Sequence, residues 1–161
     1  MIGRTRSSGD ARRRYVHVIH DSLPGFASGS RIAAQSALFV CTQNSARSQL
    51  AAALWTAITA KPALSAGTRP ADHVHRLAVS AAHRAGLTLG DPTPRHLDNV
   101  APRPSLTITV CDQVHEELDP PIDWLHWSLP DPVAVGRAAA FDACVRTQRQ
   151  RITALLGPVA A

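Results

Sequence analysis

From residue 36 onward, short apolar runs alternate with segments that carry an apolar stripe at helical spacing. The apolar runs lie at 37–40, 63–66, 106–110 and 122–127, and each has the length of one buried strand. An order of strand, helix, strand, helix is typical of βαβ units, in which consecutive strands run parallel. The sequence therefore predicts an α/β fold built on a parallel sheet.

Helices are expected between and after these runs. The first ends before Pro62 and the second before Gly86, because proline and glycine end helices at such positions. Asp72 is the candidate N-cap of the second helix. A short helix is expected over 112–118, and the last helix carries Cys144 on its inner, apolar face.

Residues 1–35 differ from the rest of the chain in charge. They hold six arginines against two aspartates, a net charge of +4, whereas residues 36–161 hold eleven basic and ten acidic side chains. We interpret 1–35 as a basic N-terminal arm with a helix over 10–22, and 36–161 as a single domain. Because the charge is concentrated in the arm, this chain alone is not expected to bind nucleic acid.

The composition is that of a globular protein: 161 residues, 45% hydrophobic and 18% charged. No apolar run reaches the ~18 residues of a membrane span, and no apolar segment of a secretory signal follows the N-terminal arginines. Cys41, Cys111 and Cys144 are odd in number and far apart, which favours free thiols in a reducing, cytoplasmic compartment. We expect no bound metal, because His73 and His75 have no third ligand at a suitable spacing.

Three chemically reactive side chains follow three of the predicted strands. Cys41 comes directly after the first strand, Cys111 ends the third, and Asp131 follows the fourth. Ligands of open α/β sheets bind beyond the carboxyl ends of the strands. We therefore expect these three side chains at one rim of the sheet.

The segment 41–48 has the spacing Cys-x5-Arg-Ser between a strand and a helix. Such a loop can wrap a tetrahedral oxyanion, with backbone N–H groups and the helix N-terminus donating to its oxygens. The same field is expected to lower the pKa of Cys41 and make it a thiolate nucleophile. Arg47 supplies a planar pair of donors for two oxygens of the anion.

The run 38–49, Leu-Phe-Val-Cys-Thr-Gln-Asn-Ser-Ala-Arg-Ser-Gln, resembles the active-site loop of the low-molecular-weight protein tyrosine phosphatase superfamily, and more closely its arsenate reductase branch. Further likeness lies at 65–68, 109–112 and 126–132, so that the resemblance covers roughly 36–156. It implies a single domain with a four-stranded parallel sheet flanked by helices.

The resemblance also implies roles for individual residues. Cys41 is the nucleophile, Arg47 clamps the oxyanion, and Asp131 is the general acid that protonates the leaving oxygen. Ser48 helps to stabilise the thiolate, and Asn44 holds the shape of the loop. The oxyanion-binding loop as a whole comprises Thr42, Gln43, Asn44, Ser45, Ala46, Arg47 and Ser48.

One departure from the phosphatases concerns the walls of the site. Ser45-Ala46 stands where tyrosine phosphatases usually carry Ile-Cys. Val133 follows the Asp-Pro pair, where the phosphatases carry aromatic residues. A flat aromatic slot for phosphotyrosine is thus not evident, and Trp124 or Trp127 would have to supply one.

A second departure concerns the reductases. Those with an internal redox relay carry two further cysteines, of which the first matches Cys111, whereas Leu118 stands at the place of the second. The resemblance therefore implies an external thiol reductant, such as mycothiol, glutathione or a redoxin, to complete the cycle. No bound cofactor is expected.

These observations predict a thiol-dependent arsenate reductase that reduces arsenate to arsenite through a Cys41 adduct, with some phosphomonoesterase activity. A second thiol, either Cys111 or an external one, is expected to release arsenite from this adduct. Its expected ligands are arsenate or a phosphate monoester, and a thiol or redoxin is a candidate partner. The alternative within the enzymes is a low-molecular-weight protein tyrosine phosphatase. The alternative outside the enzymes is a regulatory module that senses oxyanions or redox state.

Overall fold

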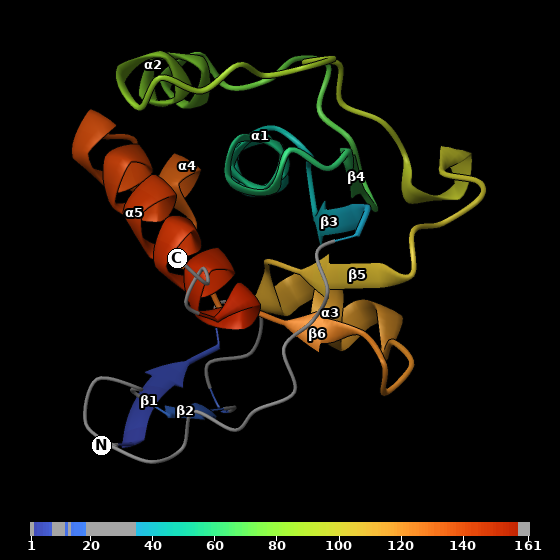
Figure 1. The fold of residues 1–161 in the computed structure, drawn as a ribbon. Helices are drawn as coiled ribbons and strands as arrows, with labels where there is room; N and C mark the ends of the chain where they lie inside the picture. Colours follow the sequence, from blue (N-terminus) through green and yellow to red (C-terminus); the bar gives the residue numbers. More distant parts are fainter. Residues whose placement is uncertain (1, 8–11, 13, 19–34, 158–161) are drawn as a thin grey trace.

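The computed structural model describes residues 2–7, 12, 14–18 and 35–157, with a four-stranded sheet at its centre (Figure 1). The strands are β3 (Ala37–Cys41), β4 (Ala63–Gly67), β5 (Leu106–Thr109) and β6 (Leu125–His126). They lie in the order β4-β3-β5-β6, and every neighbouring pair is parallel. The predicted four-stranded parallel α/β sheet is confirmed.

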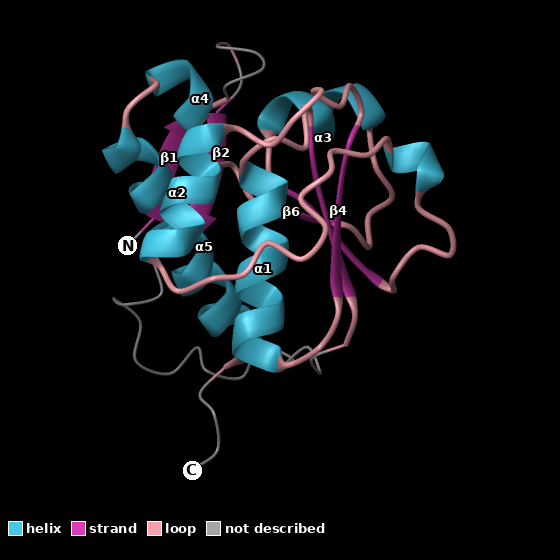
Figure 2. Ribbon diagram, turned by 90° about the horizontal axis from the view of Figure 1, so that it is seen from above, coloured by secondary structure: helices cyan, strands magenta, loops and turns pink. Residues whose placement is uncertain are grey.

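Helices cover the sheet on both faces. The long helices α1 (Arg47–Thr59) and α5 (Ala138–Leu156) pack against each other, and α2 (Arg76–Arg84) packs against α5. Figure 2 shows these three helices on the same side of the strands. Three shorter helices complete the fold: α3 (Asp112–Leu118), which contacts β3 and β5, η2 (Leu97–Asn99) and α4 (Pro132–Val135).

Most of the predicted elements have the expected bounds, including α3. The fourth strand is shorter than predicted, with two residues in place of six, because Pro121 begins a turn whose carbonyl accepts from Trp124 N. The predicted N-cap Asp72 is also wrong. His75 caps α2 instead, and its Nδ1 accepts from Leu77 N.

The helix expected over 10–22 is wrong for the part that the structure describes. β1 (Ile2–Arg6) and β2 (Arg14–Val18) form an antiparallel hairpin apart from the central sheet (Figure 1). The β2 sequence Arg-Tyr-Val-His-Val is rich in β-branched and aromatic residues, which favour a strand. The Ser7 hydroxyl, just after β1, donates to Glu116 Oε1 of α3 at 2.6 Å. Residues 10, 11, 13 and 19–22 of the predicted helix lie outside the described part of the chain.

The core lies around β3, whose residues are all buried. Phe39 packs between Trp55 and Trp127, with ring centroids 6.0 and 5.9 Å away. Trp55 is fully buried, and its indole N–H donates to the carbonyl of Gln35 at 2.9 Å. Within the described residues, no helix is long and apolar enough to cross a membrane.

Deletion of residues 1–34 is expected to leave a folded domain, because β3 begins at Ala37 and Gln35 can still accept from Trp55. Deletion of residues 1–35 removes this acceptor from a buried indole, so the free energy of unfolding should fall by about a further 1 kcal/mol. Urea unfolding followed by tryptophan fluorescence measures both variants. An insoluble 35–161 fragment would contradict the assignment of 1–35 as a separable arm.

Candidate active site

The loop between β3 and α1 is held by the segment that follows β4. The carbonyls of Cys41, Thr42, Gln43 and Ser45 each accept a backbone hydrogen bond from this segment, at 2.8–3.3 Å. The donors are the N–H groups of Thr68, Arg69, Ala71 and His75. In a trans peptide the C=O and the following N–H point in opposite directions. Outward carbonyls therefore turn the N–H groups of residues 42, 43, 44 and 46 to the inside of the loop.

A chain of hydrogen bonds behind the loop aims one hydroxyl proton at Cys41. Asn44 Oδ1 accepts from Arg95 N at 2.9 Å, which fixes the side-chain amide so that Nδ2 donates to Ser48 Oγ at 2.8 Å. The Ser48 proton is then left for Cys41 Sγ, which lies 3.0 Å from Ser48 Oγ. Asn44 also lies in the left-handed region, with φ 50°, and its backbone N–H donates to Cys41 Sγ at 3.2 Å.

Burial raises the pKa of the Cys41 thiol above its usual value, while the Arg47 guanidinium and the Ser48 hydrogen bonds act in the opposite direction. The expectation of a low pKa for Cys41 is therefore wrong for this structure. The cause is desolvation: the thiol is only 3% exposed, and burial disfavours the charged form. The Arg47 guanidinium and the Ser48 hydrogen bonds stabilise the thiolate against this effect of burial.

Arg47 and Asp131 meet across the mouth of the loop. Arg47 Nη2 lies 3.2 Å from Asp131 Oδ2, and Arg47 Nη1 donates to the Leu129 carbonyl at 3.2 Å. Asp131 is also the N-cap of α4, because its Oδ1 accepts from Val133 N at 3.0 Å. The carboxylate and the guanidinium are thus positioned beside each other by two separate elements.

These side chains line a cavity of about 240 Å³. Of the residues predicted for the site, the cavity is lined by Cys41, Thr42, Gln43, Ser45, Ala46, Arg47 and Asp131. Asn44 and Ser48 lie behind the loop and hold its shape. Gln113, Val133 and Ala134 complete the wall.

The cavity wall has no aromatic residue among the described side chains, so neither candidate tryptophan supplies a slot there. Trp127 is buried in the core against Phe39. Trp124 lines a separate cavity of about 380 Å³, where Arg103 lies 5.8 Å from its ring centroid. Trp124 precedes β6 and Trp127 follows it, and neither side chain lines the cavity beside Cys41.

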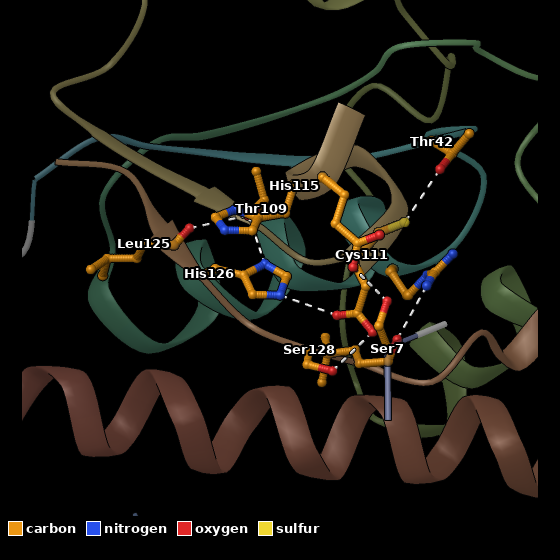
Figure 3. A network of polar contacts seen from close by, with 12 residues as sticks. Ser7, Thr42, Thr109, Cys111, His115, Leu125, His126 and Ser128 are labelled. Carbon is orange, nitrogen blue, oxygen red and sulfur yellow. Dashed lines mark hydrogen bonds and ion pairs between the residues drawn. The ribbon is translucent and has the colours of Figure 1, made fainter. Parts of the chain in front are cut away.

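Cys111 lies behind the loop rather than in the cavity wall. Its thiol is 1% exposed and contacts Thr42 Oγ1 at 3.3 Å (Figure 3). Cys144 is buried on the inner face of α5, as predicted, and burial raises its pKa to about 12. All three cysteines are free thiols. Besides Cys41, which is part of the loop, Cys111 is thus a thiol that directly contacts a loop residue.

A polar network continues from Cys111 (Figure 3). The next residue, Asp112, is almost fully buried; its Oδ1 lies 3.1 Å from His126 Nε2, and its Oδ2 accepts from Ser128 Oγ at 3.1 Å. His126 Nδ1 in turn lies 2.8 Å from Thr109 Oγ1. Asp112 therefore ties the start of α3 to the segment that leads to Asp131.

Sequence reasoning missed the residues that support the loop from a distance. A Cβ on Gly67 would lie 2.5 Å from the Thr42 carbonyl and 2.9 Å from Asn44 N, so only glycine fits there. Gln148 of α5 is fully buried and donates to the Arg47 carbonyl at 2.8 Å. The position of Gly67 at the end of a strand could have been read from the sequence. Nothing in the sequence distinguishes Gln148 from any other glutamine on a helix. The described residues hold no cluster of three or more potential metal ligands.

Comparison with known proteins places this site in context. The family model described as low molecular weight phosphotyrosine protein phosphatase matches residues 36–161. A Halobacterium salinarum protein, provisionally named as an arsenate reductase, is 33% identical over 103 residues, which are 58% of this chain and 72% of the relative.

Two solved structures extend the likeness to three dimensions. An arsenate reductase from Archaeoglobus fulgidus matches with a TM-score of 0.64 at 28% identity, over 76% of this chain and 99% of that one. A thioredoxin-dependent arsenate reductase from Corynebacterium glutamicum matches with a TM-score of 0.55 at 26% identity, over 76% of this chain and 63% of that one.

Gly67→Ala is expected to displace the loop, because the added methyl group would collide with backbone atoms of Thr42 and Asn44. The cost in unfolding free energy should be about 1–3 kcal/mol, and phosphate affinity should fall by roughly tenfold to a hundredfold. The matched control is Gly90→Ala, where a Cβ meets nothing within 4 Å. Isothermal titration with inorganic phosphate measures the affinity, and equal affinities for the two variants would contradict the role of Gly67.

Ser48→Ala is expected to move the reaction of Cys41 to higher pH. Burial already raises the pKa of Cys41, and the Ser48 hydrogen bond lowers it; its removal should raise that pKa further. The rate of Cys41 alkylation by iodoacetamide, followed by mass spectrometry from pH 5 to about pH 10, reports the thiolate. Ser45→Ala, which leaves this hydrogen bond in place, is the control. If the alkylation rate of Ser48→Ala had the same pH dependence as that of the wild type, Ser48 would not stabilise the thiolate.

Proposed function

Since the chain belongs to the low molecular weight phosphotyrosine protein phosphatase family, we propose that it is a thiol-dependent arsenate reductase with Cys41 as its nucleophile. Support comes from the Archaeoglobus and Corynebacterium relatives, which are named as arsenate reductases, and from the Halobacterium relative, which carries this name provisionally. The observation that carries the proposal is the second thiol, Cys111, in contact with Thr42 of the loop.

The first step is capture of arsenate. The inward N–H groups of the loop and the guanidinium of Arg47 bind three oxygens of the anion. The Cys41 thiolate then attacks arsenic, so that an S–As bond forms and one As–O bond breaks. The departing oxygen takes a proton from Asp131 and leaves as water. In this scheme Asp131 first takes up the proton that the Cys41 thiol loses and then passes it to the departing oxygen, so the proton balance closes.

The second step transfers the electrons. A second thiolate attacks Cys41 Sγ; an S–S bond forms and the S–As bond breaks, with the electron pair remaining on arsenic. Arsenic is reduced from As(V) to As(III) and leaves as arsenite, while two thiols are oxidised to one disulfide. Cys111 is our candidate for the second thiol, because a single loop residue, Thr42, lies between it and the anion site.

The cycle closes with an external thiol reductant. Leu118, at the place of a further relay cysteine, cannot accept the disulfide, so the reductant must reach Cys41 or Cys111 itself. The Corynebacterium relative is named as thioredoxin-dependent. A redoxin, mycothiol or glutathione therefore remains the proposed electron donor for this chain.

Phosphatase activity is a second candidate function, favoured by Asp131 in the cavity wall beside Arg47. The same Cys41 attack on a phosphate monoester would form a thiophosphate, with Asp131 protonating the leaving alcohol. Val133 and Ala134 also line the cavity, and they are too small to sandwich an aromatic ring. Hydrolysis of an aryl phosphate without any arsenite release from arsenate would favour this alternative.

Single-turnover reduction tests the proposed function and the role of Cys111 together. Reduced protein mixed with arsenate without added thiol is expected to release one equivalent of arsenite, to lose two titratable thiols and to form a Cys41–Cys111 disulfide. Cys111→Ser should abolish this thiol-free turnover, and Cys41→Ser should abolish all turnover.

Cys144→Ser is the matched control, because Cys144 is equally free and also buried. It is expected to retain the full yield of arsenite. Arsenite formed only with added thiol, and no bridge in the peptide map, would contradict the intramolecular step. No arsenite with any of the thiol donors would contradict the proposed function.

A further inference from the structure

Gln148 lies on the buried face of α5 where this helix crosses the start of α1. It is fully buried, and its Nε2 donates to the backbone carbonyl of Arg47 at 2.8 Å. Arg47 is the first residue of α1, and the N-cap Ala46 forms no side-chain cap hydrogen bond. The turn that carries Arg47 is thus held from α5, by a residue 101 positions later in the chain.

Stability does not explain a glutamine at this place. A carbonyl in the first turn of an α-helix already accepts from the N–H four residues later, which for Arg47 is Ala51. Gln148 Oε1, in contrast, is buried and has no hydrogen-bond partner in the described part of the chain. A buried acceptor without a partner destabilises the fold, and an apolar side chain of the same shape would avoid that cost.

The same face of α5 also holds the segment that carries Asp131. Arg151, one turn after Gln148, donates through Nη2 to the Ser128 carbonyl at 3.2 Å. Figure 3 shows Ser128 beside this helix. One helix, α5, thus contacts both the backbone of Arg47 and the segment that leads to Asp131.

We propose that Gln148 is a positioning residue for Arg47: it fixes the main chain from which the guanidinium reaches the oxyanion and Asp131. This inference rests on the oxyanion site of the proposed function, and it assigns to Gln148 a part in anion binding rather than in folding. The Arg47 guanidinium is held at its far end by Leu129 and Asp131. Gln148 holds the other end of the same residue.

The test is Gln148→Met, which has a similar length, is apolar and favours helix. Inorganic phosphate is the probe, and its affinity is measured by the protection of Cys41 against iodoacetamide. We expect phosphate affinity to fall by about fivefold to tenfold, the worth of one hydrogen bond to a positioned group. The thermal midpoint of unfolding should stay the same or rise, because the unpartnered Oε1 is removed. Gln150→Met is the matched control, since Gln150 lies two residues later on the exposed face of α5.

A double-mutant cycle separates positioning from general damage. In an Arg47→Lys background, Gln148→Met should have little further effect on phosphate affinity, because the geometry that it supports is already lost. A lowered thermal midpoint together with the same loss of affinity in both backgrounds would overturn the inference and make Gln148 a structural residue. Wild-type protein that binds phosphate but releases no arsenite would remove the proposed reaction and leave this inference standing.

Discussion

The structure of the site depends on the hydrogen bonds between the loop carbonyls and the segment after β4. Four carbonyls between Cys41 and Ser45 accept from this segment, and the planarity of the peptide group then turns the N–H groups inward. The close approach of the two chains requires glycine at position 67. The anion site that we propose depends on this segment, because the segment satisfies the carbonyl acceptors of the peptides whose N–H groups point inward.

The chemistry of Cys41 follows from two opposing effects in a confined space. Burial raises the pKa of the thiol, whereas Arg47 and Ser48 lower it. Hydrogen-bond donors surround the sulfur, and water is excluded from it. Such a site suits the proposed attack of the Cys41 thiolate on a bound oxyanion, in which negative charge moves from sulfur to the oxygens of the anion. The series of hydrogen bonds from Arg95 N through the Asn44 side chain to Ser48 Oγ orients the Ser48 hydroxyl toward Cys41 Sγ.

Several supports of the site come from elements that are remote in the chain. Asp112 of α3 accepts from Ser128, and Arg151 of α5 donates to the carbonyl of the same residue. The segment that carries Asp131 is therefore held from both sides, beside the Arg47 that α5 also holds. The thiol of Cys111, directly before Asp112, contacts Thr42 of the loop.

The sequence by itself determined the parallel α/β class and the Cys-x5-Arg loop after the first strand, because periodicity and local spacing are properties of neighbouring residues. Of the three side chains predicted at one rim, Cys41 and Asp131 line the cavity, whereas Cys111 does not. The sequence did not determine the β1–β2 hairpin, where propensities for helix and strand compete over few residues. Nor did it determine which side chains line the cavity: Trp127 turned into the core, and Cys111 lies behind the loop. Contacts such as that of Gln148 with the Arg47 carbonyl join residues 101 positions apart. Only the packing of α5 on α1 decides such pairs, because no local pattern in the chain encodes which distant backbone group a buried side chain will meet.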